Sequence, residues 1–196
     1  MPDFDLTPAT DEMAALVAAV PDADLDGPTP CAATTVGALL DHIGGLSLAF
    51  TVAATKEELP GGPMAPSADA AHLPEGWRTE IPARLRALAT AWREPGAWEG
   101  MTMAGPVEMP APVAALVALD EVMIHGWDLA RATGQPFAPD PALLEVLHGF
   151  VSGFAGPGKE ADREGLFGPE VAVPADAPLL DRVVGITGRD PGWTPA

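Results

Sequence analysis

The 196-residue chain is strongly acidic: 28 aspartate and glutamate residues stand against 10 lysine and arginine residues, which gives a formal net charge of −18. A field of this sign repels phosphate groups, and no basic stripe interrupts it, so the composition argues against nucleic acids and anionic membranes as partners. Hydrophobic residues make up 47% of the chain and charged residues 19%, as in one globular domain with a substantial core.

The protein is expected to be cytoplasmic. No apolar run in the sequence is long enough and free enough of charge to span a bilayer. The acidic N-terminus has no basic region of the kind that opens a secretory signal. The single cysteine, Cys31, excludes an intramolecular disulfide and fits a reducing compartment.

Two amphipathic helices are predicted before residue 59. Thr7 is a candidate N-cap with Pro8 at the first helical position, because both residue types favour helix starts. A second helix is expected to begin at Thr34 or Thr35 and to reach about Glu58. Apolar residues at helical spacing predict the buried faces, which are formed by Met13, Leu16, Val17 and Val20 in the first helix and by Leu39, Ile43, Leu46 and Phe50 in the second.

A loop, a third helix and an extended connector are predicted next. Residues 59–78 are rich in proline and glycine and are expected to form the loop. Thr79 is a candidate cap for the third helix, which carries Pro82 in its first turn. The segment Met101–Met109 has little helical periodicity and is expected to be extended.

The last part of the chain is predicted to contain two longer helices and one short helix. The fourth helix spans about Pro112–Thr133 and stops at Gly134, a residue type that ends many helices. Asp140 and Pro141 are expected to open the fifth, and one short helix is expected over residues 178–187. No strand series or internal repeat is evident, so the sequence predicts an all-α bundle.

This bundle is expected to occupy residues 1–156 and to bind a metal ion. Residues 157–196 are mostly irregular and are predicted to form a C-terminal extension that packs on the bundle.

Three side chains are candidate metal ligands. Glu121 and His125 are four residues apart in the fourth predicted helix, which places a carboxylate and an imidazole one turn apart on the same side. His42 lies beside the apolar stripe of the second predicted helix. Two imidazoles and one carboxylate form the ligand set of a catalytic zinc site, which leaves a fourth position open. The alternative is a Glu–His pair at the surface, or one satisfied by a hydrogen bond inside the core.

Several other residues are candidates for supporting roles near this pattern. Asp128, three residues beyond His125, is a candidate acceptor that would orient the imidazole as an outer-shell partner of the metal. Its alternative partner is Arg131, one turn further on. His148 is a reserve ligand. Cys31 has no base near it in the sequence and is expected to have a small, buried, apolar role.

Several segments resemble a known family. The segment Asp120–Gly134 resembles the fourth-helix signature of the DinB/YfiT-like metal-binding proteins. Leu39–Ile43 and Pro28–Cys31 resemble the helix-two motif and the preceding loop of one actinobacterial branch. That branch is related to the N-terminal domain of mycothiol-dependent maleylpyruvate isomerase. Parts of the tail, Val173–Arg182 and Gly188–Pro191, are similar to members of the same branch.

The resemblance implies a DinB-like four-helix core with an extra helix. It also implies a divalent metal ion, usually zinc or nickel, held by His42, Glu121 and His125. Some relatives are enzymes that use mycothiol, bacillithiol or glutathione. The chain is too short for the complete second domain of the isomerase, so the resemblance does not imply isomerase activity itself.

The first functional hypothesis is a metal-dependent enzyme that acts on a small molecule. Its cosubstrate would be a low-molecular-weight, mycothiol-like thiol used in transfer, conjugation or isomerisation. The second hypothesis is a non-catalytic metal- or ligand-binding protein. The third is a hydrolase, lyase or cyclase that uses the metal without a thiol. Beyond the metal centre the sequence identifies no catalytic residue, and it leaves the oligomeric state open, a dimer included.

Overall fold

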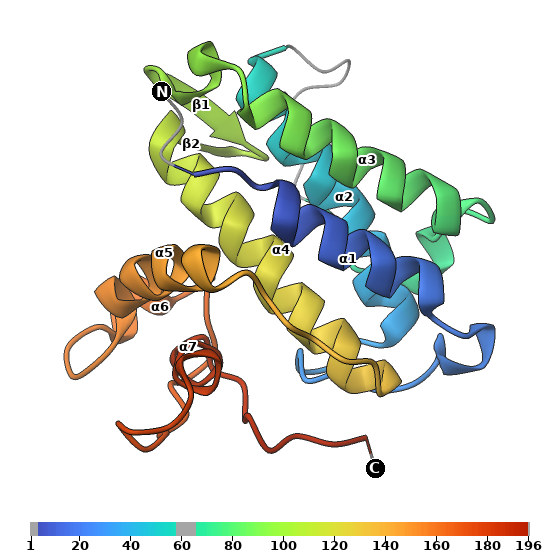
Figure 1. The fold of residues 1–196 in the computed structure, drawn as a ribbon, viewed down its shortest axis with the longest axis vertical. Helices are drawn as coiled ribbons and strands as arrows, with labels where there is room; N and C mark the ends of the chain where they lie inside the picture. Colours follow the sequence, from blue (N-terminus) through green and yellow to red (C-terminus); the bar gives the residue numbers. More distant parts are fainter. Residues whose placement is uncertain (1–3, 58–65, 196) are drawn as a thin grey trace.

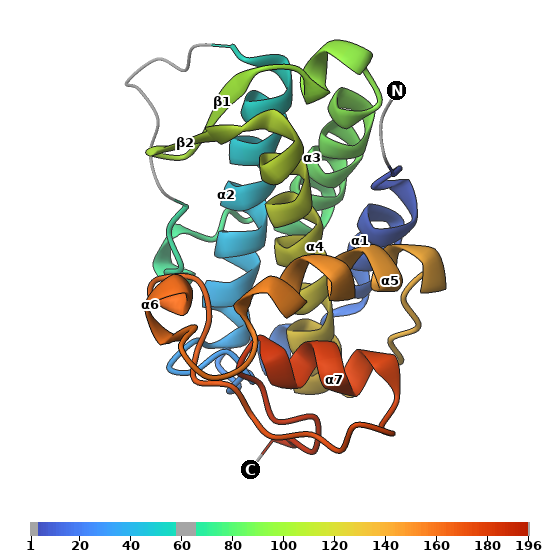
Figure 2. The same cartoon turned by 90° about the vertical axis from the view of Figure 1, so that its left-hand side faces the viewer.

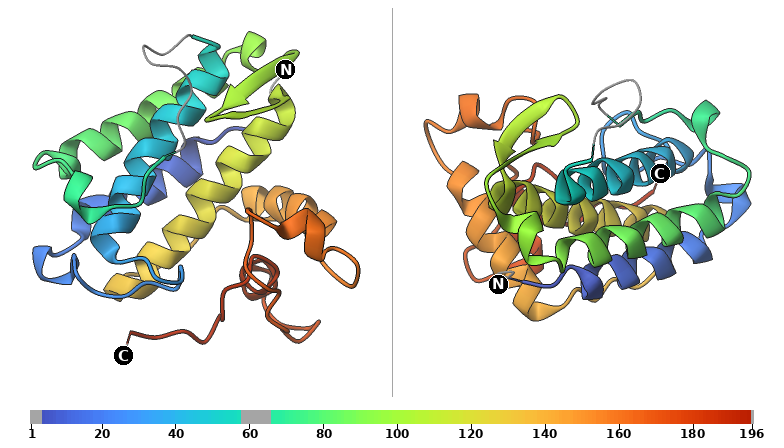
Figure 3. Two further views of the ribbon diagram at one scale, coloured as in Figure 1. Left: turned by 180° about the vertical axis from the view of Figure 1, so that it is seen from behind. Right: turned by 90° about the horizontal axis from the view of Figure 1, so that it is seen from above.

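The computed structural model describes residues 4–57 and 66–195. Four long helices lie alongside one another as a bundle, in which α1 and α2 each contact both α3 and α4 (Figure 1). The left view in Figure 3 shows the C-terminal segment, coloured orange to red, below them. The four are α1 (Thr7–Ala19), α2 (Val36–Thr55), α3 (Trp77–Trp92) and α4 (Ala111–Thr133). The predicted all-α fold is confirmed.

The structure confirms two predicted helix starts and one predicted helix end. Thr35 caps α2, because its hydroxyl accepts a hydrogen bond from the Ala38 amide at 3.3 Å. Asp140 caps α5 (Pro141–Val151) by accepting from the amides of Ala142 and Leu143 at 2.9 and 3.0 Å. Gly134 ends α4 in the left-handed conformation with φ of 65°.

Two other predicted caps are wrong. Thr7 lies inside α1, and its amide and hydroxyl donate to Asp5 at 2.9 and 2.7 Å. Helix α3 begins at Trp77, two residues before Thr79. Tertiary contacts explain the earlier start, because Trp77 is buried and the next residue, Arg78, donates to the carbonyl oxygen of Val20 at 2.7 Å.

Helix α2 ends earlier than predicted. Its last residue is Thr55, and Lys56 follows in the left-handed conformation with φ of 58°. The Lys56 ammonium group donates to the carbonyl oxygens of Gly96 and Glu99 at 2.8 and 2.6 Å. These bonds fix Lys56 at the end of the helix. Glu58, the predicted end, lies outside the described residues.

The predicted connector is extended, but it pairs with itself. Strands β1 (Met101–Ala104) and β2 (Val107–Pro110) form an antiparallel hairpin whose turn contains Gly105 at φ of 55°. The Thr102 hydroxyl donates to the carbonyl oxygen of Ala53 at 2.6 Å and fastens the hairpin to the end of α2.

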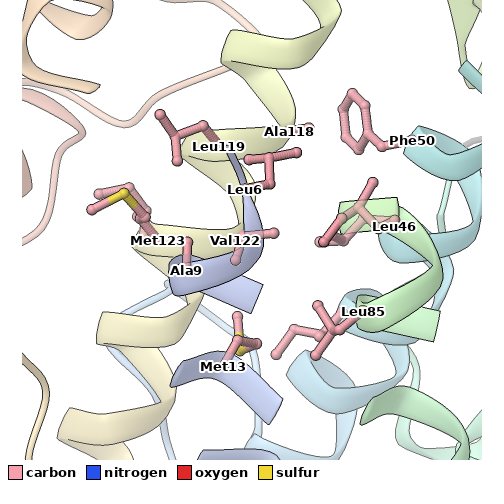
Figure 4. Packing of buried hydrophobic residues seen from close by; sticks show 14 of the residues in the cluster. Leu6, Ala9, Met13, Leu46, Phe50, Leu85, Ala118, Leu119, Val122 and Met123 are labelled. Atoms are coloured by element: carbon pink, nitrogen blue, oxygen red, sulfur yellow. The ribbon is translucent and has the colours of Figure 1, made fainter. Parts of the chain in front are cut away.

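The hydrophobic core lies between the four long helices. Figure 4 shows how side chains from all four meet there. The residues that Figure 4 labels are Leu6, Ala9, Met13, Leu46, Phe50, Leu85, Ala118, Leu119, Val122 and Met123.

Helix α2 is long and apolar enough to cross a membrane by length and composition, so the expectation that the sequence contains no such run is wrong. In its most apolar window, 61% of the residues are buried inside the protein, and this core position accounts for the composition.

The C-terminal segment wraps over one end of α4. Helices α5 and α7 (Leu179–Ile186) contact each other and lie across α4 in Figure 2. A short helix that was not predicted, α6 (Glu160–Arg163), ends at a buried arginine. The Arg163 guanidinium donates to the carbonyl oxygens of Phe154 and Gly168, and to that of Ile186 at 2.6 Å. These bonds tie three parts of the segment together.

Candidate metal centre

His42 on α2 meets Glu121 and His125 on α4. The same glutamate oxygen, Oε2, lies 3.0 Å from Nε2 of His125 and 3.5 Å from Nε2 of His42. One donor atom from each of the three residues lies within 4.8 Å of the other two. Helical spacing aligns the pair on α4, and the packing of α2 against α4 brings in the third residue.

Both imidazole rings are oriented through their other nitrogen. Nδ1 of His125 lies 3.0 Å from the carboxylate of Asp128, and Nδ1 of His42 lies 3.2 Å from the carbonyl oxygen of Ser67. Both partners accept hydrogen bonds, so each Nδ1 carries the proton. In the neutral ring the lone pair is then on Nε2, which points at Glu121.

Asp128 connects the centre to the C-terminal segment. Its side chain is fully buried and accepts two bonds from Arg189, from Nε at 3.3 Å and from an NH2 group at 3.0 Å. The alternative pairing of Asp128 with Arg131 is wrong, because Arg131 donates to the carbonyl oxygens of Pro191 and Trp193. The arginine that fixes Asp128 therefore comes from 61 residues further along the chain.

Charges in the centre are strongly coupled. Burial disfavours ionisation of Glu121, but its interactions with His125 and His42 outweigh this effect and hold the pKa of this carboxyl below its usual range. Burial also favours the neutral ring of His125, yet its bonds to Asp128 and Glu121 raise its pKa to about 10. Burial and the charge of Glu121 raise the pKa of Asp120 to about 8.

These residues fit a divalent metal ion. Two imidazole nitrogens and one carboxylate oxygen converge, and both rings present the unprotonated nitrogen when neutral. A carboxylate behind a ligating histidine, as Asp128 lies behind His125, is the usual outer-shell arrangement of such sites. The surface-pair alternative is wrong, because His125 is only 7% exposed. The other alternative, a Glu121–His125 pair satisfied by a hydrogen bond inside the fold, accounts for the same contact without a metal. Metal binding therefore stays a prediction.

A cavity of about 440 Å³ opens onto the three side chains. Leu39 and Ile124 form apolar parts of its wall, and Asp120 lies beside Glu121. The loop before α2 contributes further wall residues, and so does the C-terminal segment. These further residues are Pro30, Cys31, Ala32 and Thr34 from the loop, and Gly165–Gly168 and Thr187–Arg189 from the segment.

Sequence reasoning missed several residues of this site and misjudged one. Arg189 and Asp120 gave no local signal, and Ser67 contributes only its backbone carbonyl. Cys31 is half-buried and lines the cavity beside His125, so the expectation that it is buried is wrong. His148 belongs to neither cluster of potential ligands among residues 4–57 and 66–195.

Zinc binding is expected to release about one proton per ion at pH 7. The pKa of His125 is about 10 in the metal-free protein, so the ring is protonated at pH 7 and must lose the Nε2 proton to bind zinc. Affinity is therefore expected to rise about tenfold per pH unit between pH 7 and 9, because one proton competes with the metal. Titration calorimetry in two buffers of different ionisation enthalpy measures the released proton. Equal apparent enthalpies in both buffers would contradict the expectation.

Residues 6–130 match the family described as the mycothiol maleylpyruvate isomerase N-terminal domain. The chain belongs to this family. The match confirms the resemblance seen in the sequence, and its range includes His42, Glu121 and His125. Arg189 and the cavity wall at Gly165–Gly168 lie outside it.

Individual proteins and solved structures are also similar to this chain. Two uncharacterized proteins of Mycobacterium tuberculosis, from two strains, are 32% identical over 187 residues, which covers 92% of this chain and 93% of each relative. The crystal structure of a mycothiol-dependent maleylpyruvate isomerase has a TM-score of 0.57 at 22% identity. It covers 77% of this chain and 71% of the isomerase chain. A mutant of that isomerase matches with the same TM-score at 21% identity. The structural likeness shows a shared fold.

Proposed function

We propose that this protein is a cytoplasmic, metal-dependent enzyme that acts on a small molecule with a low-molecular-weight thiol, such as mycothiol, as cosubstrate. The reaction class would be transfer, conjugation or isomerisation. The observation that carries the proposal is the convergence of His42, Glu121 and His125 at a cavity large enough for a small molecule.

The three residues would hold zinc, or nickel in its place. A bound zinc ion would lower the pKa of a thiol or water in its open position and so supply a nucleophile at neutral pH. Asp128 would keep the His125 ring in the binding tautomer, and Arg189 would fix Asp128 in turn. Leu39 and Ile124 in the cavity wall would limit the access of bulk water to this nucleophile.

The choice of a thiol rests on the family. The matched family and the similar crystal structures carry mycothiol in their descriptions, and the arrangement of donors in this chain is compatible with a thiol ligand. The domain division belongs to the same proposal. Residues 1–156 would supply the metal ligands, and the extension over residues 157–196 would close the cavity through Gly165–Gly168 and Arg189.

Cobalt substitution tests the proposed function. The zinc-free protein is loaded with Co²⁺ and titrated with mycothiol while absorbance is recorded in the near ultraviolet. A new sulfur-to-metal charge-transfer band that saturates at one thiol per chain is expected. An unchanged spectrum would contradict the thiol proposal. Turnover of an electrophile without any thiol would favour a hydrolase, lyase or cyclase, and absence of both results would favour a non-catalytic metal-binding protein.

A further inference from the structure

Cys31, the single cysteine of the chain, faces the cavity in front of the candidate metal centre. Its Sγ, a nitrogen of His125 and a carboxylate oxygen of Asp128 lie within 4.8 Å of one another. The Thr34 hydroxyl lies 3.7 Å from the same sulfur and donates to it. The loop before α2 thus places a thiol where a molecule in the cavity would meet it.

Two basic side chains line the cavity together with this sulfur. Burial opposes the charge of Arg189, but its pKa is raised, chiefly by Asp128 and in part by the charge that Cys31 can carry. Arg189 and Cys31 line the same cavity. His125 provides a second N–H-bearing ring beside the sulfur. Attack on a disulfide requires the thiolate form of the attacking sulfur.

An unsatisfied acceptor in the same cavity points to a ligand. Asp120 is 8% exposed and lines the cavity, and its Oδ1 has no hydrogen-bond partner among the residues that the structure describes. Buried polar atoms are nearly always paired, so a bound molecule with a hydroxyl or amide donor would complete this one. A cysteine and an open acceptor therefore share one small-molecule cavity.

We propose that Cys31 is a site of reversible thiolation that closes the cavity. The disulfide of a low-molecular-weight thiol, R–S–S–R, would enter the cavity, and the Cys31 sulfur would attack one of its sulfur atoms. A Cys31–S–S–R bond forms as the S–S bond of the reagent breaks. The leaving sulfur departs with the bonding electron pair, takes the proton that Cys31 loses, and is released as R–SH. The disulfide is itself the oxidant.

The adduct controls access to the centre. An R group attached to Cys31 occupies the cavity onto which His42, Glu121 and His125 open. Excess thiol reverses the exchange, so the ratio of disulfide to thiol sets the fraction of open protein. The inference rests on the proposed function in the choice of the thiol and in the metal centre whose access the adduct controls.

Intact-mass spectrometry of the full chain tests this site. The protein is incubated with mycothiol disulfide or, in parallel, with glutathione disulfide, whose additional carboxylates are repelled by the net charge of −18 on the chain. One adduct per chain is expected, located on Cys31 by peptide mapping, lost in Cys31→Ser and removed by dithiothreitol. Mycothiol disulfide is expected to react about tenfold faster than glutathione disulfide, the effect of about one additional hydrogen bond.

A matched variant and a second readout sharpen the result. Asp120→Ala is expected to remove the preference for mycothiol disulfide, because it removes the open acceptor. The adduct is expected to abolish the cobalt–thiol band of the wild type. Absence of an adduct would overturn the inference. A native chain that, like the urea-unfolded chain, reacts with both disulfides at equal rates would also overturn it. So would an adducted protein that keeps the cobalt–thiol band.

The two proposals fail separately. A chain that binds no metal and shows no cobalt–thiol band refutes the proposed function, whereas the adduct on Cys31 is measured without metal or turnover. A normal band in a chain that forms no adduct refutes the thiolation site alone.

Discussion

Replacing Glu121 with alanine is expected to lower the zinc content of the purified protein from about one ion per chain to less than about a tenth of an ion. Glu121 provides the only negative charge among the three proposed ligands, and both imidazole Nε2 atoms converge on its Oε2. Its removal leaves two neutral nitrogens for a divalent ion. Metal analysis of protein purified without chelator measures the change.

The control for this variant is Glu145→Ala, which removes an exposed glutamate from α5 and should leave the zinc content unchanged. Circular dichroism is expected to show the same helix content in both variants, because the Glu121 side chain is 29% exposed and is not part of the core. A full zinc content in Glu121→Ala would show that Glu121 does not hold the metal.

The largest loss of stability is expected from Asp128→Ala, about 3–5 kcal/mol in the free energy of unfolding. The Asp128 side chain is completely buried and pairs with both His125 and Arg189. Its removal leaves a guanidinium that is 12% exposed without its carboxylate partner. Urea denaturation of metal-free protein measures the loss without a contribution from metal binding.

Asp162→Ala is the matched control, because Asp162 forms its ion pair with Lys159 at the surface. Its cost is expected to be below about 1 kcal/mol, since exposed pairs are screened by water. Asp128→Ala is also expected to weaken zinc binding by about 10- to 100-fold through the lost orientation of His125. If the two variants had equal unfolding free energies, the buried Asp128 pair would not stabilise the fold.

The sequence was sufficient to predict the bundle and the placement of the three candidate ligands within it. Helical periodicity located α4, and the four-residue spacing of Glu121 and His125 put them on one face of it. His42 could be placed on an inward face of α2 because its neighbours at helical spacing, Leu39 and Leu46, are apolar. Local patterns of this kind depend only on nearby residues.

Features that depend on distant contacts were not predictable. Nothing local to Arg189 indicates that it contacts Asp128, because the C-terminal segment must first fold over α4. The absence of a base near Cys31 in the sequence was misleading, since His125 reaches it only through packing. Likewise, the early start of α3 follows from the burial of Trp77, which no capping rule contains.

X-ray absorption spectroscopy of the zinc-loaded protein is the most direct test of the proposed centre. We expect about one zinc ion per chain, with two imidazoles and one carboxylate oxygen at about 2.0–2.2 Å and one further light ligand. Comparison with His42→Ala should show the loss of one imidazole. A protein that neither retains nor takes up zinc, or a spectrum without two imidazoles, would contradict the assignment of His42, Glu121 and His125 as ligands.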